Sequence, residues 1–339
     1  MSNKINLNDK NSINNKNNSA NNKNHNNTAV LILSCPDKKG IVASVSKALF
    51  DGGANIIESN QYSTKPPNGH FFMRVVFELD ANADKNKSML AIKSKLDVAV
   101  SEFSINYKIG DFSVKKNAAV FVSKEDHCLN ELLWQKNAGD ILLNISCIIS
   151  NHTNLSSIAN FYKIPFIYVP CDSGSLSTFN TLDNNPYAYN SGYSRKADNK
   201  TMITKQEEII LEKINNFDVD FVILAKYMRI FSEQFINLFA KKIINIHHSF
   251  LPSFPGAKPY EQAYEKGVKI IGATAHFVNE KLDDGPIIEQ DVIRITHEAD
   301  TDDLKRKGKI IERLVLAKAV KLFIEDRIIE YGNKTIVFD

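Results

Sequence analysis

The chain has 339 residues, which is enough for two domains of ordinary size, and hydrophobic residues make up 43% of it. No apolar run approaches the length of a membrane span, and a formal net charge of +3 is nearly balanced, so we expect neither a membrane nor a nucleic-acid partner. The four cysteines have no metal or redox spacing, which favours a reducing compartment. We expect the cytoplasm, with the mitochondrion as the alternative.

Residues 1–28 are a low-complexity segment of Asn, Lys and Ser that is almost empty of apolar side chains. Such a segment cannot bury enough surface to offset its chain entropy. We therefore predict a disordered Asn-rich tail, which lacks the apolar core of a secretion signal.

Residues 29–112 have the pattern of a first, small domain. Apolar runs and helical spacings alternate in the order strand, helix, strand, strand, helix, strand. This order is typical of the ferredoxin-like arrangement. The predicted elements are residues 30–34, 41–50, 55–63, 70–79, 89–100 and 103–108.

Residues 116–339 form the second predicted domain, in which strands and helices alternate along the chain. Alternation of this kind predicts a Rossmann-like, doubly wound α/β domain with a parallel sheet and sites at the carboxyl ends of its strands. Residues 172–203 interrupt the pattern and are interpreted as a loop insertion. The predicted elements are residues 118–123, 127–137, 145–149, 154–162, 165–169, 204–216, 219–224, 231–239, 243–246, 272–278 and 301–325, with a last strand-like segment at 328–338.

Asn245 and His247 stand two residues apart at the end of an apolar run that is typical of a buried strand. Their side chains should therefore point to the same side. Asp283 follows in a Leu-Asp-Asp-Gly-Pro turn sequence. An amide, an imidazole and a carboxylate are groups that acyl chemistry uses to hold an oxyanion and move a proton. On residue types alone, a loop-capping Asn, a core His and a turn Asp are the simpler interpretation.

The sequence around these residues resembles a known family. Asn-Ile-His-His-Ser-Phe-Leu-Pro from Asn245, followed by Leu-Asp-Asp-Gly-Pro-Ile from Leu282, is similar to the signature of the folate-dependent formyltransferase fold. The resemblance implies that Asn245, His247 and Asp283 are the catalytic residues, here called the catalytic trio. It requires the turn at Asp283 to fold back onto the end of the strand.

The first domain resembles the ACT domain, an amino-acid-sensing module. The resemblance rests on Cys-Pro-Asp-Lys-Lys-Gly-Ile-Val from Cys35, followed by Gly-Ala-Asn-Ile from Gly53. It implies an effector site at a domain–domain interface and association of subunits into a homo-oligomer. The alternative is that Gly40 and Asn55 serve only turn geometry. The matching effector positions are Asp37, Gly40, Asn55 and Ile56.

An ACT-like domain ahead of a formyltransferase-like core is the architecture of the formyltetrahydrofolate deformylase family. Phrases such as Leu-Ala-Lys-Tyr-Met-Arg from Leu224 resemble that family, and the absence of glycine between Val122 and Gly139 disfavours a phosphorylated amine acceptor. The resemblance implies a hydrolase of a formamide C–N bond, which converts 10-formyltetrahydrofolate to formate and tetrahydrofolate. Its formate would supply purine biosynthesis and balance the one-carbon folate pool. The alternatives are formyl transfer to an amine and a non-catalytic folate- or amino-acid-responsive binding protein.

The same resemblance implies the remaining partners and site residues. We expect folate as the substrate, no separate cofactor, and methionine and glycine as activating and inhibiting effectors. No set of His, Cys and carboxylate residues has convincing metal-ligand spacing, so we predict no metal. The implied folate contacts are Leu224, Met228, Arg229, Phe231, Leu282, Gly285 and Pro286. The candidates for lining the acceptor pocket are Ser123, Lys124, His127 and His152.

Overall fold

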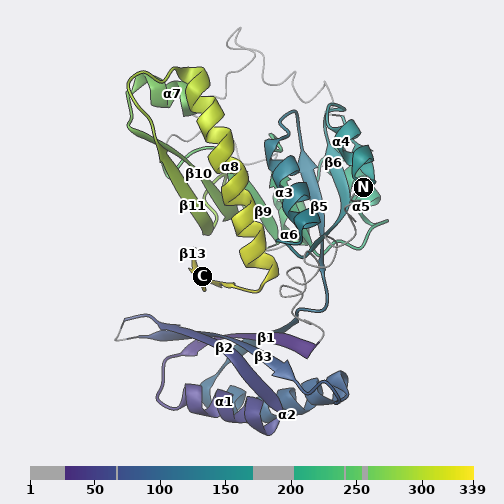
Figure 1. The fold of residues 1–339 in the computed structure, drawn as a ribbon, viewed down its shortest axis with the longest axis vertical. Helices are drawn as coiled ribbons and strands as arrows, with labels where there is room; N and C mark the ends of the chain where they lie inside the picture. The colour runs from purple at the N-terminus through teal and green to yellow at the C-terminus, as the bar shows by residue number, and fades with distance from the viewer. Residues whose placement is uncertain (1–26, 66–67, 171–201, 240–241, 254–258) are drawn as a thin grey trace, which may run out of the picture. The chain divides into compact units, whose positions relative to one another are not determined.

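The computed structural model describes residues 27–65, 68–170, 202–239, 242–253 and 259–339 (Figure 1). The predicted tail, up to residue 26, and nearly all of the predicted insertion at 172–203 lie outside the described residues. The chain divides into two compact units, Met1–Val114 and Lys115–Asp339, and each is described by itself. None of the described helices is long and apolar enough to cross a membrane.

The first unit has the predicted ferredoxin-like order of elements. Its described strands pair in the order β2-β3-β1-β4, and every neighbouring pair is antiparallel. Both helices lie on one face of this sheet (Figure 1) and bury the alternate strand residues beneath them. The elements are β1 (Thr28–Pro36), α1 (Ile41–Asp51), β2 (Ala54–Ser63), β3 (His70–Leu79), α2 (Lys85–Phe103) and β4 (Asn106–Asp111).

The second helix of this unit is longer than the sequence pattern predicts. Asp84 begins it four residues early, because its side chain accepts hydrogen bonds from the first backbone amides of the helix. Phe103 is buried on the same face as Leu96 and Ala99, so the helix continues to it and ends at Ser104, which has a left-handed backbone. The prediction of a strand from residue 103 was wrong in its start, since β4 begins at Asn106.

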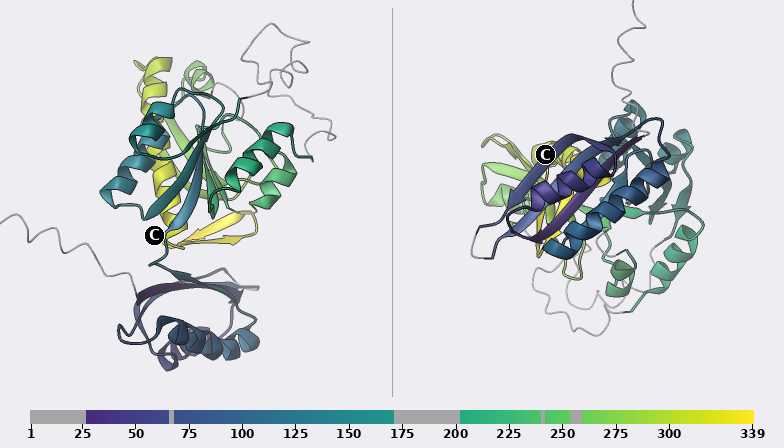
Figure 2. Two further views of the ribbon diagram at one scale, coloured as in Figure 1. Left: turned by 90° about the vertical axis from the view of Figure 1, so that its right-hand side faces the viewer. Right: turned by 90° about the horizontal axis from the view of Figure 1, so that it is seen from below.

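The second unit is built on a twisted sheet (Figure 2). Its seven described strands have the order β11-β10-β9-β8-β5-β6-β7. Strands β5 to β9 run parallel, as predicted, whereas β10 and β11 are antiparallel to their neighbours. The elements are β5 (Lys116–Val122), α3 (His127–Ala138), β6 (Leu143–Ser150), α4 (Ser156–Phe161), β7 (Phe166–Tyr168), α5 (Lys205–Ile214), β8 (Phe221–Ala225), α6 (Glu233–Leu238), β9 (Ile243–His247), α7 (Pro259–Glu265), β10 (Ile270–Phe277), β11 (Ile287–Arg294), α8 (Thr301–Ile324), β12 (Ile328–Tyr331) and β13 (Lys334–Val337).

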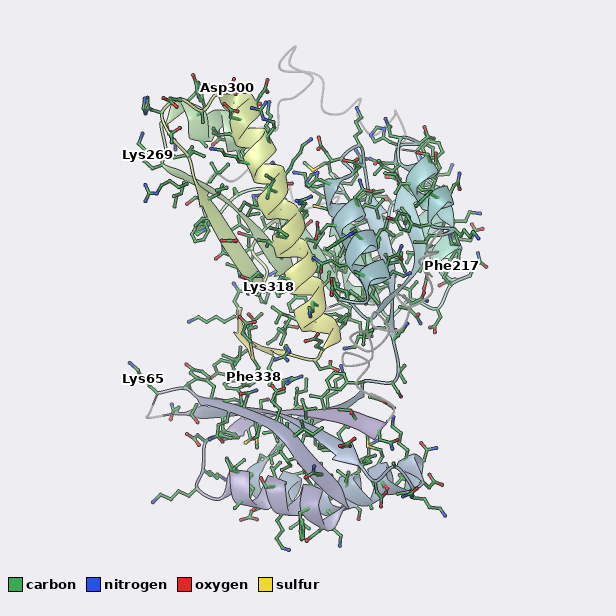
Figure 3. All side chains as sticks on the ribbon, viewed as in Figure 1. Lys65, Phe217, Lys269, Asp300, Lys318 and Phe338 are labelled. Atoms are coloured by element: carbon green, nitrogen blue, oxygen red, sulfur yellow. The ribbon has the colours of Figure 1, made fainter. Side chains whose placement is uncertain are left out.

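Helices cover both faces of this sheet, as a doubly wound domain requires. One apolar cluster joins α3, α4 and α8 to one face, and a second joins α5 and α6 to the other. Helix α8 is the longest element, and Figure 3 labels Asp300 at its start and Lys318 near its other end. Asp300 and Asp303 form a capping box that fixes where α8 begins. The sheet and its two helical layers hold the carboxyl ends of the parallel strands in fixed register.

Three segments of this unit were not resolved into elements by the sequence pattern. Helix α7 has only seven residues, too few to show a clear period. Strand β11 is an edge strand with mostly polar, partly exposed residues, so it lacks the apolar run of a buried strand. The final strand-like segment folds into the hairpin β12–β13, which turns at Gly332 with a φ of 61°.

Candidate active site

The carboxyl ends of β8 and β9 bring the motif residues to one edge of the sheet. Asn245 pairs with Leu224 on β8 and with His276 on β10, and His247 pairs with Thr274. Asn245 and His247 therefore lie side by side between a parallel and an antiparallel neighbour. His247 is buried, and Asn245 is partly exposed.

The turn at Leu282–Pro286 folds back onto β10, as the motif interpretation requires. The carbonyl of Pro286 accepts a hydrogen bond from the amide of Phe277 at 2.9 Å. Gly285 packs so closely on this strand that a Cβ there would overlap the carbonyl oxygen of Phe277. Asp283 adopts a φ of 54°, in the left-handed region that Asp tolerates better than most residues. The tight turn therefore aims the Asp283 side chain at β9.

His247 and Asp283 form the central contact of the site. Their Nδ1 and Oδ2 atoms are 3.3 Å apart. Burial on its own would raise the pKa of the Asp283 carboxyl, but the hydrogen bond and charge of His247, together with His276, lower it. Among the described residues, the buried Nε2 of His247 finds no hydrogen-bond partner. This nitrogen is therefore available to a bound molecule.

Asn245 is oriented by His276, which the sequence analysis did not assign to the site. The Nδ1 of His276 lies 2.8 Å from the carbonyl oxygen of Phe277, which can only accept, so Nδ1 carries the proton. Burial lowers the pKa of His276, and its neutral Nε2 accepts a hydrogen bond from the Asn245 amide at 3.2 Å. One N–H of Asn245 is thereby fixed, and the other remains for a ligand.

Thr274 anchors the loop that follows His247. Its hydroxyl donates to the carbonyl of Ser249 at 2.9 Å and accepts from the amide of Leu251 at 3.1 Å. Gln290 on β11 bonds the same hydroxyl at 2.8 Å and the carbonyl of Leu251 at 3.1 Å. The loop after His247 is thus held by hydrogen bonds to the antiparallel strands β10 and β11.

The segment after β8, implied to contact folate, is fixed at three points. The Met228 amide donates to the Ser123 hydroxyl at 3.3 Å, and the Ser232 amide donates to the buried Glu207 carboxylate at 2.6 Å. Between them, Phe231 stacks on Phe235 with ring centroids 4.2 Å apart. Met228 is 48% exposed on this rigid segment. Of the other implied folate residues, Arg229 is partly exposed, Leu282 is exposed, and Leu224, Gly285 and Pro286 are buried.

The four pocket candidates divide into two groups. Ser123 donates to Asn151 at 2.7 Å, across the ends of β5 and β6. The Lys124 side chain is exposed, and burial and the Lys124 charge lower the pKa of His152. His127 instead turns toward α8, where its Nε2 donates to Glu312 at 2.8 Å. Ser123 and His127 therefore meet different parts of the sheet edge.

His127, Cys128 and Glu312 bring ligand atoms within 4.8 Å of one another, a spacing that could hold a metal ion. However, the Glu312 carboxylate already accepts from Lys226 at 3.1 Å as well as from His127. The Tyr260 hydroxyl donates to the same carboxylate at 2.6 Å. A carboxylate that already accepts from three donors, one of them an ammonium group, is a poor fit for a cation.

The predicted effector residues do not come together within the first unit. Asp37 follows the last residue of β1, and Gly40 begins α1 with a φ of 98°. Asn55 pairs with Glu78, which also pairs with the first residue of β1. A nine-residue strand separates these positions by about 26 Å. The Asp37 and Gly40 pair and the Asn55 and Ile56 pair therefore lie at opposite ends of the sheet.

Comparison with known proteins agrees with this geometry. Residues 116–320 match the family model described as formyl transferase, and residues 29–87 match the ACT domain model. The chain is 42% identical to formyltetrahydrofolate deformylase of Bacillus subtilis (strain 168), over 91% of this chain and 93% of that protein. The chain belongs to the formyltetrahydrofolate deformylase family.

Solved structures of formyltetrahydrofolate deformylases have the same fold. The enzyme from Pseudomonas syringae pv. tomato str. DC3000 matches with a TM-score of 0.78 and 36% identity, over 92% of this chain and 94% of that chain. Glycinamide ribonucleotide transformylase 1 from Symbiobacterium toebii matches with a TM-score of 0.55 and 26% identity, over 66% of this chain and 95% of that chain. The predicted fold class, an ACT-like domain before a formyltransferase-fold domain, is confirmed.

Sequence reasoning missed two groups at this edge of the deformylase fold. The sequence around His276 is equally compatible with a supporting residue of the site and with a core residue, although its position seven residues before Asp283 places it on the strand that carries the turn. Glu312 gave no signal, because one acidic residue in a long amphipathic helix is ordinarily exposed. Both become visible only when distant strands and helices are brought together.

The ionisation of Asp283 should depend on His247. In His247→Ala we expect the pKa of Asp283 to rise, because burial remains while the hydrogen bond and charge that lower it are removed. The lowered pKa contributes stability above the ordinary carboxyl value of 3.8, and this stability is lost as the pH falls through the lowered pKa. NMR titration of labelled Asp carboxyl groups, with Asp283→Asn to assign the signal, measures the shift. An Asp283 pKa equal in both proteins would contradict the pairing.

Proposed function

We propose that this protein hydrolyses 10-formyltetrahydrofolate to formate and tetrahydrofolate, with Asn245, His247 and Asp283 as its catalytic residues. The observation that carries the proposal is the buried His247, which is held by Asp283 through Nδ1 and has an unpartnered Nε2 beside Asn245. The relatives at 37% to 42% identity are named for this reaction. These names favour hydrolysis over amine transfer and over a non-catalytic binding protein.

Each member of the catalytic trio is proposed to have a separate task. The free N–H of Asn245 and the Nε2–H of charged His247 donate to the formyl oxygen as it gains negative charge. Asp283 stabilises the charged imidazole and accepts a proton from the attacking water. The water oxygen bonds to the formyl carbon. The bond from that carbon to the folate nitrogen then breaks, and His247 donates a proton to this nitrogen. The products are formate and tetrahydrofolate.

The folate is proposed to lie along the fixed segment after β8. Exposed Met228 and partly exposed Arg229 offer apolar and polar contacts there, while Leu224 and Phe231 form its buried base. Leu282, Gly285 and Pro286 contribute the opposite wall from the Asp283 turn. Ser123, Lys124 and His152 line the acceptor side. No separate cofactor enters this mechanism.

We place the reaction in the cytoplasm, where its formate supplies purine biosynthesis. The described cysteines Cys35, Cys128 and Cys147 are free and buried, which suits a reducing compartment.

Asn245→Ala should slow formate release from 10-formyltetrahydrofolate by about 10²–10³-fold, because one oxyanion donor is lost. The assay contains no amine, so that the formate measured comes only from hydrolysis. Asn144→Ala, an exposed substitution on β6, is the matched control and should keep the wild-type rate. An unchanged rate in folded Asn245→Ala removes Asn245 from the chemistry, and no formate from the wild type overturns the proposed function.

The ACT domain is proposed to bind amino-acid effectors between two copies of the chain. The separation of the Asp37 loop from Asn55 supports this arrangement, because one copy could supply each half. Methionine would activate and glycine would inhibit, and the shared site would hold the chains in a homo-oligomer. Gly40 and Ile56 complete the two halves.

Methionine should raise the rate of formate release and glycine should lower it, each with a saturable response. Asp37→Ala should lose both responses, whereas Asp97→Ala, an exposed substitution on α2, should keep them. The measurement is the initial rate across a titration of each amino acid. Flat titrations with wild-type protein would overturn effector binding without affecting the proposed reaction.

A further inference from the structure

A buried ionic cluster lies at the sheet edge beside the catalytic trio and takes no part in the mechanism above. Its centre is Glu312 on α8, whose side chain is 1% exposed. The carboxylate accepts from the Tyr260 hydroxyl at 2.6 Å, from His127 at 2.8 Å and from Lys226 at 3.1 Å. The donors come from α7, from α3 and from the residue after β8, so one carboxylate fixes three separate segments.

Several local features at this cluster are unfavourable for the stability of the fold. Lys226 has a φ of 63°, in the left-handed region that favours glycine. Gly308 lies inside the long helix α8, where glycine is unfavourable, and a Cβ there would overlap the Tyr260 hydroxyl. Burying a carboxylate and an ammonium group also removes both from water. Apolar side chains would fill this space without these costs, so stability alone does not explain the cluster.

The register of the sheet places Lys226 next to the reacting groups. Leu224 pairs with Asn245, and the residues two positions beyond them are Lys226 and His247. On the other side, Val122 pairs with Ala225, so Lys226 stands between the ends of β5 and β9. Burial, together with the charges of Lys226 and His247, lowers the pKa of neighbouring His248 to about 3. Lys226 therefore lies in the middle of the row of strand ends that carries the site.

The turn with Asp283 occupies the space on one side of His247. The turn that carries Asp283 folds over the β10 side of β9 and contacts His247 directly. On the other side of β9 lie the ends of β8 and β5, which are followed by the acceptor candidates Ser123 and Lys124. The same fold also serves glycinamide ribonucleotide transformylases, which are named for an amine-bearing ribonucleotide. A structural difference between the two kinds of enzyme on this side can decide whether water or an amine is the acceptor.

We propose that Lys226, held rigidly by Glu312, is the residue that restricts the acceptor to water. Its side chain fills the space over the end of β8 that the substituent of an amine would need, while a water molecule still fits. Glu312 is a positioning residue, since it prevents Lys226 from swinging out to solvent. This inference rests on the proposed function and deepens it.

The test is the double variant Lys226→Gly/Glu312→Gln. Glycine adopts the left-handed backbone freely and empties the space, and the glutamine amide avoids a buried charge without a partner while still facing Tyr260 and His127. Lys226→Met/Glu312→Gln is the matched control, because it removes the same charges but keeps a long side chain. Lys318→Met removes an ion pair with Glu289 elsewhere on α8 and controls for changes in the helix (Figure 3).

Each folded protein is incubated with 10-formyltetrahydrofolate and hydroxylamine or glycinamide, and formate and formylated amine are both measured. In transfer, the amine nitrogen bonds to the formyl carbon, the carbon–nitrogen bond to folate breaks, and the amine proton passes to the folate nitrogen. We expect the ratio of formylated amine to formate to rise at least about tenfold in the Gly variant. The wild type, the Met control and Lys318→Met should keep the low ratio.

An unchanged ratio in a Gly variant that folds, as judged by circular dichroism and thermal unfolding, overturns the inference. A rise of equal size in the Met control also overturns it, because charge and not the filled space would then set the acceptor. A wild type that releases no formate would instead overturn the proposed function. The two failures are therefore distinguishable.

Discussion

The close approach of the Asp283 turn to β10 is the constraint on which the active site depends. Because Gly285 lacks a Cβ, the turn can pack against the carbonyl of Phe277. This packing places Asp283 3.3 Å from His247 and leaves Nε2 of His247 facing the site. The same strand carries His276, which orients Asn245. One backbone contact thus brings Asp283 to His247, on the strand whose His276 orients Asn245.

The sheet edge is organised by charge on both sides of β9. Toward β10, Asp283 lies beside His247, and the neutral His276 accepts from Asn245. Toward β8, Glu312 gathers Lys226 and two further donors. Each set is costly to bury and is compensated only by its own partners. The arrangement fixes geometry at the reacting groups more than it stabilises the fold, which the two apolar clusters of the sheet do.

Much of this structure could be predicted from sequence because it depends on local patterns. Apolar periodicity gave the alternating strands and helices, and the spacing of Asn245 and His247 placed both at a strand end. The resemblance to a known motif added Asp283. Contacts between distant segments could not be predicted, since nothing near Glu312 in the sequence indicates partners at the residue after β8 and on α3. The strand at 272–278 was predicted, but its antiparallel direction was not, because strand direction depends on connections and not on composition. Strand β11 was missed because it lacks an apolar run.

The central claim is that the Asp283 carboxylate, placed by the turn, makes His247 competent for hydrolysis. It is tested most directly by the single-turnover rate of formate release in Asp283→Asn, compared with wild type, at saturating 10-formyltetrahydrofolate and without amine. The substitution keeps the shape of the side chain and removes its charge. We predict a rate lower by about 10²–10⁴-fold, the usual contribution of a general acid–base group. A folded variant that releases formate at the wild-type rate would contradict the account.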